Sequence, residues 1–267
     1  MDKAKLDMTP KMKPDNKPDT LFDFYRTPMG KVVRRLLSRR LQSVLPAQPT
    51  STHDSWLTAG IGYARPYMNL ISRSFGHQIM LQLSGYTMRS WPKGKASKLA
   101  EVDESHLPLL PSMLDHVLMV HGLEATNRPD ELLDETWRLL KGGGKFTLVV
   151  PYRRGIWASQ DHTPFGHGQP FSQRQLRDVL ELHGFSVHRI SSALILPPVT
   201  SAIYTRLAPI VERLPHAFGG VLVAAAEKQV YSARPVAHKS WRLKPRAVPD
   251  MAKPTTRDVA RVIKRKI

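Results

Sequence analysis

The chain has 267 residues, 41% of them hydrophobic, which is enough apolar material for one substantial buried core with flanking tails. It contains no cysteine, which excludes disulfides, thiolate metal sites and cysteine nucleophiles and agrees with a cytoplasmic protein. Its formal net charge of +18 raises the question of a polyanionic partner.

The first 50 residues are predicted to form a disordered segment followed by a helical cover. Residues 1–20 alternate Lys and Asp with Pro and contain no apolar run, so we expect neither a secretory signal nor fixed structure there. Over 21–50, apolar residues recur at helical spacing as far as Val44, which predicts one amphipathic helix or two broken near Pro28. Such a helix covers one face of a domain or, alternatively, lies on a membrane surface through its basic side.

Residues 51–231 are predicted to form one α/β domain, because apolar runs alternate with helical patterns. A buried strand at 55–59 leads into Gly60-Ile61-Gly62, and Pro66 favours a helix over 66–75. Further strands are predicted at 78–83 and 98–102. A strand, a glycine turn and a helix open nucleotide-binding folds, but Arg65 stands where a dinucleotide fingerprint has its third glycine, which argues against a nicotinamide cofactor.

The second half of this domain continues the alternation. A fourth strand is predicted at 114–120, and Asn127 is expected to cap a helix that reaches Leu140 and stops at the glycines of 142–144. A fifth strand follows at 145–150, and Ser172 opens a capping box for a helix that ends at Gly184. The last strands, at 185–190 and 220–226, flank a helix at 203–214. We therefore expect a mostly parallel sheet with helices on both faces.

The segment from 107 to 146 contains Leu107-Pro108-Leu109, then the strand from Leu114 to Val120 with His121 directly behind it, and the glycine turn before Lys145. In the order and spacing of these elements the α/β domain resembles the class I S-adenosylmethionine-dependent methyltransferases of the ubiquinone/menaquinone type. The resemblance implies a Rossmann-like class I methyltransferase sheet and S-adenosylmethionine as the cofactor. The block at 151–171 resembles a segment shared within a bacterial subgroup of this family.

The resemblance also assigns cofactor contacts. The glycine turn would lie beside the methionine part, Asp103 would accept the adenine amino group, and His121 would lie near the sulfonium. The family's usual acids in the first two strands are missing, since no Asp or Glu occurs between Asp54 and Glu101. A neutral side chain near the end of the second strand is then left for the ribose, at a cost of tenfold or more in affinity. The candidate cofactor residues are Gly60, Gly62, Ala64, Gln82, Asp103 and His121.

Acceptor-binding and catalytic candidates follow the fifth strand. Arg153 and Arg154 are expected to attract an acidic group and Trp157 to stack on the acceptor; the alternative is a rigid lid packed on the sheet. His121 and His167 are the candidates for removing a proton, although methyl transfer needs no obligatory base. No metal is expected, because the neighbouring His and Asp residues match no known ligand spacing.

The C-terminal segment carries much of the positive charge. From Lys228 to Ile267 there are 12 Lys/Arg and 2 Asp/Glu, a balance of +10. Residues 232–267 are therefore predicted to form a basic disordered tail that contacts a polyanion or an acidic membrane, or that is simply solvated. The predicted function is S-adenosylmethionine-dependent methyl transfer to an unknown acceptor. The alternative is a non-catalytic module of this fold that binds a protein, nucleic acid or an acidic membrane.

Overall fold

A computed structural model describes residues 18–46, 56–71, 77–84, 90–92, 94–159, 163–166, 168–195 and 219–230. All of them belong to one compact unit within Met1–Pro235. The predicted disorder before residue 18, the helix at 203–214, the tail at 232–267 and the candidate His167 lie outside the described residues.

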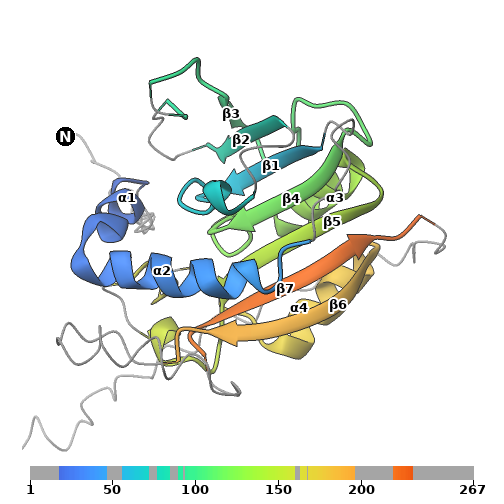
Figure 1. Cartoon of the computed structure of the whole chain (residues 1–267). Coiled ribbons are helices and arrows are strands. Elements are labelled where there is room, and N and C mark those ends of the chain that lie inside the picture. Colours follow the sequence, from blue (N-terminus) through green and yellow to red (C-terminus); the bar gives the residue numbers. More distant parts are fainter. Residues whose placement is uncertain are drawn as a thin grey trace, which may run out of the picture. The chain divides into compact units, whose positions relative to one another are not determined.

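The centre of the described fold is a seven-stranded sheet in the order β3-β2-β1-β4-β5-β7-β6 (Figure 1). β7 runs antiparallel to both of its neighbours, and every other neighbouring pair is parallel, so the predicted mostly parallel sheet is confirmed. The strands are Leu57–Gly62 (β1), His77–Leu83 (β2), Leu99–Val102 (β3), Leu114–Val120 (β4), Leu140–Pro151 (β5), Phe185–Ala193 (β6) and Val221–Lys228 (β7).

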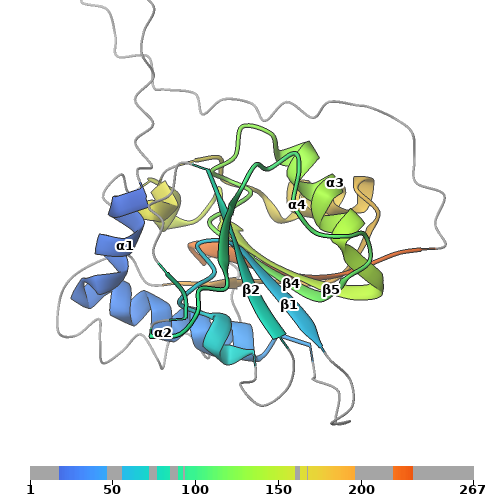
Figure 2. The same ribbon diagram turned by 90° about the horizontal axis from the view of Figure 1, so that it is seen from above.

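Helices cover both faces of this sheet (Figure 2). The helices α3 (Pro129–Leu139) and α4 (Gln173–Leu182) lie on one face, and α2 (Pro28–Gln42) lies on the other. Because β4 is covered from both sides, its residues from His116 to Val120 are all buried, which explains why the strand is apolar from Val117 to Val120.

The N-terminal cover consists of two helices, α1 (Pro18–Arg26) and α2, as the broken-helix alternative predicted. Thr27 ends the first and caps the second, since its hydroxyl accepts a hydrogen bond from the Gly30 amide at 3.0 Å. A Cβ on Gly30 would lie 2.0 Å from the Phe24 carbonyl oxygen, so only glycine allows the two helices to approach this closely. The apolar side of α2 is buried through Val33, Leu36, Leu37 and Leu41.

Three local predictions were wrong. Instead of a helix from Pro66, the described chain forms a turn and one short 3-10 helix, η1 (Met68–Leu70), on the sheet face that α2 also covers. Helix α3 is preceded by Arg128 rather than capped by Asn127, because Pro129 already provides its first turn. The glycines of 142–144 lie inside β5, which begins at Leu140 directly after α3.

Candidate functional site

Four parallel strands end at one edge of the sheet and bring the predicted cofactor residues there. β1, β2, β3 and β4 end at Gly62, Leu83, Val102 and Val120, and they are neighbours in the sheet. The residues that follow these ends are Tyr63, Ser84, Asp103 and His121. The carboxyl edge of a parallel sheet is where open α/β folds bind ligands.

The two glycines of β1 have different structural roles. Gly62 has a φ of +69°, and a Cβ there would lie 2.6 Å from the Val120 carbonyl oxygen, so the turn after β1 requires glycine. Gly60 lies inside the strand, where a Cβ would be 2.6 Å from the Met80 sulfur and 2.8 Å from the Met68 sulfur. Ala64 is buried beside it, with its Cβ 3.1 Å from the same position. Gly60 is thus held by core packing, and a substitution there would disturb the core before it reported on a ligand.

The end of β2 shows what stands in place of the missing acids. Gln82 is half-buried opposite Glu101 of β3, and the exposed Ser84 donates its hydroxyl to the Val102 carbonyl oxygen at 3.3 Å. In β1, Thr58 is buried and accepts a hydrogen bond from the Trp56 indole at 3.1 Å. At the end of β2, Gln82 and Ser84 can accept hydrogen bonds from a ribose without the added strength of a carboxylate, whereas Thr58 is buried inside the fold.

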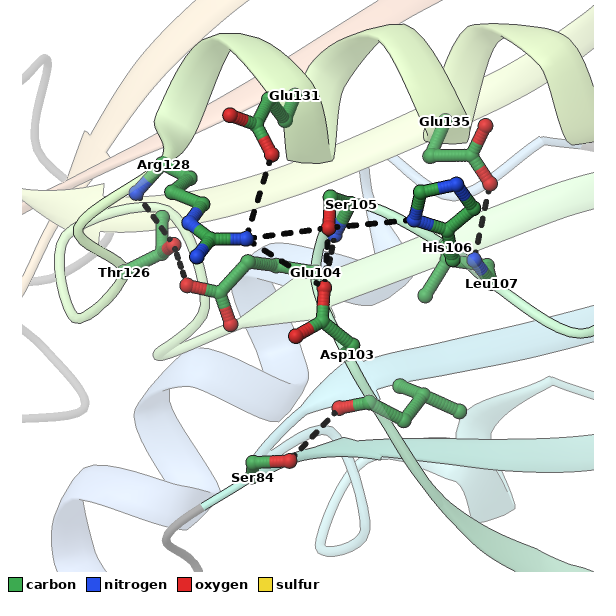
Figure 3. Close-up of polar contacts among 11 residues, drawn as sticks. Ser84, Asp103, Glu104, Ser105, His106, Leu107, Thr126, Arg128, Glu131 and Glu135 are labelled. Carbon is green, nitrogen blue, oxygen red and sulfur yellow. Dashed lines mark hydrogen bonds and ion pairs between the residues drawn. The ribbon is translucent and has the colours of Figure 1, made fainter.

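Asp103 lies on an open, polar rim after β3 (Figure 3). Its side chain is 57% exposed, and both the amide and the hydroxyl of Ser105 donate to its Oδ1. The Arg128 guanidinium lies 3.8 Å from the same oxygen. The Ser105 hydrogen bonds, with the charge of Arg128, hold the pKa of Asp103 below its usual range, so the group is ionised at neutral pH. Among the described residues these contacts all use Oδ1, which leaves Oδ2 to accept from a ligand.

Side chains of α3 fix the loop that carries Asp103. The Arg138 guanidinium donates to the carbonyl oxygens of Leu107 and Leu109, each at 3.0 Å, and Glu135 accepts from the Leu107 amide at 2.9 Å. The hydrogen bond from Arg138 lowers the pKa of Glu135. The Leu107 motif noted in the sequence is therefore held at both its amide and its carbonyl groups.

His121, at the end of β4, lies in an enclosed environment. Its side chain is 4% exposed, and its φ of 52° turns the chain sharply away from the strand. Its Nδ1 lies 3.0 Å from Glu124 Oε1, and its Nε2 lies 3.0 Å from the Tyr25 hydroxyl. The Tyr67 hydroxyl donates to that of Tyr25, so the Tyr25 hydroxyl donates in turn to Nε2, and Nδ1 carries the ring hydrogen that it donates to Glu124.

Aromatic rings surround this histidine. The Tyr25 ring is stacked on Tyr63 at 5.3 Å between centroids, and the Tyr67 hydroxyl donates to that of Tyr25 at 3.1 Å. The Phe165 ring lies 4.9 Å from the His121 ring. Burial raises the pKa of Tyr25 well above its ordinary value, so this phenol stays protonated at neutral pH. The other carboxylate oxygen of Glu124 is buried and has no hydrogen-bond partner among the described residues.

The predicted acceptor-binding residues do not lie together. Trp157 is fully buried, packed edge-on against Phe165 at 5.6 Å and against Gly220, as the rigid-lid alternative expects. Stacking on a ligand would require Trp157 to leave this packing. Arg153 and Arg154 are exposed, and Arg153 donates to the Pro170 carbonyl oxygen at 3.3 Å.

The described residues offer little for a metal site or a membrane span. Within the described ranges, no group of three His, Asp or Glu residues is arranged to hold a metal ion. None of the described helices is long and apolar enough to cross a membrane. An open groove is lined by Gly142, His188 and Glu227, among others, far along the sheet from the carboxyl ends of β1 and β4 and without any predicted site residue.

Two residues of this site were missed from the sequence. Tyr25 lies 96 residues from His121, and its place on a buried helix face gave no sign of that partner. Glu124 follows His121 by three residues, a spacing that lets a turn bring the two side chains together. The local spacing could have suggested Glu124, whereas only the fold reveals Tyr25.

Comparisons with known proteins agree with this geometry. Residues 57–148 match the family model described as a methyltransferase domain. No curated protein matches the chain. The solved structures that resemble it include S-adenosylmethionine-dependent methyltransferases of Thermotoga maritima (15% identity, 80% of this chain and 97% of that one, TM-score 0.61) and of Archaeoglobus fulgidus (20%, 78% and 99%, 0.53). A chain from the Haloferax volcanii complex between the Trm112 methyltransferase activator and a methyltransferase is also similar. The identity is 18%, the match covers 81% of this chain and 99% of that one, and the TM-score is 0.58.

Three observations indicate a methyltransferase fold: the strand order, the antiparallel β7 and the family match over β1 to β5. S-adenosylmethionine is the cofactor of this family. Residues 57–148 match the methyltransferase-domain model, and the described residues have the fold of the class I S-adenosylmethionine-dependent methyltransferases.

Proposed function

We propose that the chain transfers a methyl group from S-adenosylmethionine to an acceptor at the carboxyl edge of β1 and β4. The observation that carries this proposal is the shared edge, on which the Gly62 turn, Asp103 and His121 follow the ends of neighbouring parallel strands. The finer assignment to the ubiquinone/menaquinone type stays a prediction.

The residues present fit this cofactor at two points. The Gly62 turn has no side chain, so a ligand can approach the backbone after β1. Asp103 is ionised and keeps Oδ2 open among its described neighbours, as an acceptor for the adenine amino group must. Gln82 and Ser84 would hold the ribose with neutral hydrogen bonds, so we expect weaker binding than an acid at this place would give.

S-adenosylmethionine, when bound, supplies a methyl group on a positively charged sulfur. The chain's own part is to orient the acceptor, exclude water and hold a proton. His121 is the group suited to hold that proton, because Glu124 fixes its Nδ1 hydrogen and leaves Nε2 as an acceptor. His121 is also shielded from solvent, as the methyl-transfer end of the site requires.

Thermal unfolding of the full chain with S-adenosylmethionine tests the proposal. A ligand at 100 times its dissociation constant stabilises the folded state by about 2.7 kcal/mol, so the midpoint should rise with ligand concentration. Adenosine and methionine, added separately, are the matched controls and should raise it less. A midpoint that does not move at millimolar cofactor would favour the non-catalytic binding module instead.

A further inference from the structure

Helix α1 inserts a phenol next to the end of the site where methyl transfer is proposed. The Tyr25 hydroxyl lies 3.0 Å from His121 Nε2, and its ring is stacked on Tyr63 with 20° between the ring planes. Tyr63 directly follows the Gly62 turn, and its amide donates to the Val120 carbonyl oxygen. The chain's own phenol therefore lies between the glycine turn and the proton-accepting histidine.

The surroundings of Tyr25 suit a neutral aromatic hydroxyl compound. Phe24 and Tyr67 present ring edges to the Tyr25 ring, with interplanar angles of 83° in both cases. The hydroxyl meets a donor on one side, Tyr67, and an acceptor on the other, His121 Nε2. The stacked Tyr63 ring and the two edge-on rings define the plane of the Tyr25 ring. The donor and the acceptor define the position of its hydroxyl.

Tyr25 reaches this place from a short helix. Helix α1 has nine residues and is separated from the longer, well-packed α2 by Thr27 alone. If α1 withdrew, Phe24 would leave with it, but a free phenol could still make the Tyr25 contacts with Tyr63, Tyr67 and His121, because none of those contacts uses the Tyr25 backbone.

We propose that Tyr25 occupies the acceptor's place and that the acceptor is a hydroxylated aromatic compound, whose hydroxyl takes the position of the Tyr25 hydroxyl on His121 Nε2. The proposal rests on the proposed function. In the transfer, the acceptor's O–H bond breaks and its proton goes to Nε2, where the resulting imidazolium is paired with the Glu124 carboxylate. The oxygen forms a bond to the methyl carbon while the carbon–sulfur bond breaks, and the sulfur keeps that electron pair.

The test uses 4-methylphenol, which is the tyrosine side chain without its backbone. Full-length Tyr25→Gly vacates the place, and thermal unfolding is first measured without cofactor in the presence of 4-methylphenol or of toluene, which lacks the hydroxyl. We expect 4-methylphenol to raise the midpoint more than toluene does. This preference should disappear in Tyr25→Gly/His121→Leu, which has no acceptor for the hydroxyl.

Leu21→Ala is the matched control, because it shortens another fully buried side chain of α1 and leaves Tyr25 in place. It should lose stability without gaining any preference for 4-methylphenol. Equal stabilisation of Tyr25→Gly by 4-methylphenol and toluene would overturn the proposal.

The second readout is the methyl ether of 4-methylphenol, measured by mass spectrometry with S-adenosylmethionine present. We expect Tyr25→Gly to form it about tenfold faster than the unchanged chain, because the internal competitor is gone. If Tyr25→Gly does not fold, Tyr25→Ala replaces it, since it vacates the same place and alanine is the better helix former; it should also form the ether faster than the unchanged chain.

The two proposals fail in different ways. If the cofactor still raises the midpoint but no variant forms the ether, the acceptor proposal is wrong and the proposed function stands. If the cofactor has no effect on the midpoint while the hydroxyl preference persists, methyl transfer is wrong and the phenol-binding place remains.

Discussion

The rim after β3 and the enclosed region after β4 belong to the same sheet edge but differ in solvation. At the rim, Asp103 and Arg128 have side chains more than half exposed, and they contact each other at 3.8 Å. In the enclosed region, the side chains of His121 and Glu124 are 4% and 1% exposed, and Tyr25 covers them from α1. Because the same edge is open at one end and closed at the other, substitutions at the two ends should affect different properties.

At the open end the folded state gains little from each polar contact, since exposed ion pairs contribute about 0–1 kcal/mol. A change there should alter ligand binding and leave stability almost unchanged. At the closed end the side chains of Tyr25, His121 and Glu124 are buried, so a change leaves cavities and unpaired groups. Substitutions at the two ends should therefore separate an effect on stability from an effect on binding.

The largest effect is expected for Tyr25→Ala. Truncating a buried aromatic side chain costs about 3–5 kcal/mol, and here it also removes the hydrogen bonds that the Tyr25 hydroxyl makes with Tyr67 and His121. The free energy of unfolding, measured with urea, should fall by that amount. Arg26→Ala, at an exposed position of the same helix, is the control and should change it by less than about 0.5 kcal/mol. A loss below 1 kcal/mol for Tyr25→Ala would mean that the enclosed end is not closed by α1.

The second effect concerns His116, a buried polar residue on β4. Burial lowers the pKa of His116 from 6.5 to about 3, so between these pH values the unfolded chain binds a proton that the folded chain does not. The free energy of unfolding should therefore decrease as the pH falls from 6.5 towards 3, by about 1.4 kcal/mol per pH unit from this residue.

Urea unfolding of the chain and of His116→Gln at pH 7 and pH 5 measures this term. The glutamine variant, which cannot titrate, should lose about 2 kcal/mol less over that interval. Equal losses in the two proteins would show that His116 is more solvated than its place beside Thr147 indicates.

The third effect is on binding alone. Asp103→Asn removes the negative charge from the proposed adenine acceptor, and a hydrogen bond to a charged group is worth about 1.5–3 kcal/mol. Calorimetric affinity for S-adenosylhomocysteine should fall by about 10-fold to 150-fold, with the urea midpoint nearly unchanged. Glu131→Gln, a second exposed acid that Arg128 contacts at 3.6 Å, serves as the control and should retain full affinity. If Asp103→Asn lowered the stability and kept the affinity, the exposed end would support the fold instead of binding the ligand.

The smallest effect is expected for Arg128→Gln. The guanidinium lies near Asp103 and Glu131 at ion-pair distances of 3.8 Å and 3.6 Å, and its side chain is 53% exposed. We expect affinity for S-adenosylhomocysteine to change by less than about threefold and to become slightly less dependent on salt. A change of tenfold or more would place Arg128 in direct contact with the ligand.

Much of the sheet could be predicted from the sequence, because each strand is a local pattern. The run from Leu114 to Val120 predicts a strand buried on both faces. The Ser172 hydroxyl accepts a hydrogen bond from the Gln175 amide, as expected for the serine of a capping box. The helix predicted from Pro66 was wrong, since a proline at a first turn allows a helix without demanding one and packing decided otherwise. Local pattern carries no information on which element covers which face.

The site was predictable only in part, for the same reason. Asp103 and His121 were assigned through the family resemblance, and the structure has each of them directly after a strand end. The partner of His121 could not, because Tyr25 comes from a helix far away in the sequence and meets it through packing alone. The methionines beside Gly60 were equally hidden, and they show that a glycine in this motif also serves the core.

The most direct measurement is a crystal structure of the full chain with S-adenosylhomocysteine. We predict the adenine amino group within hydrogen-bond distance of Asp103 Oδ2 and the amino-acid part of the ligand beside the Gly62 turn. A ligand bound elsewhere, or an adenine that makes no contact with Asp103, would contradict the account.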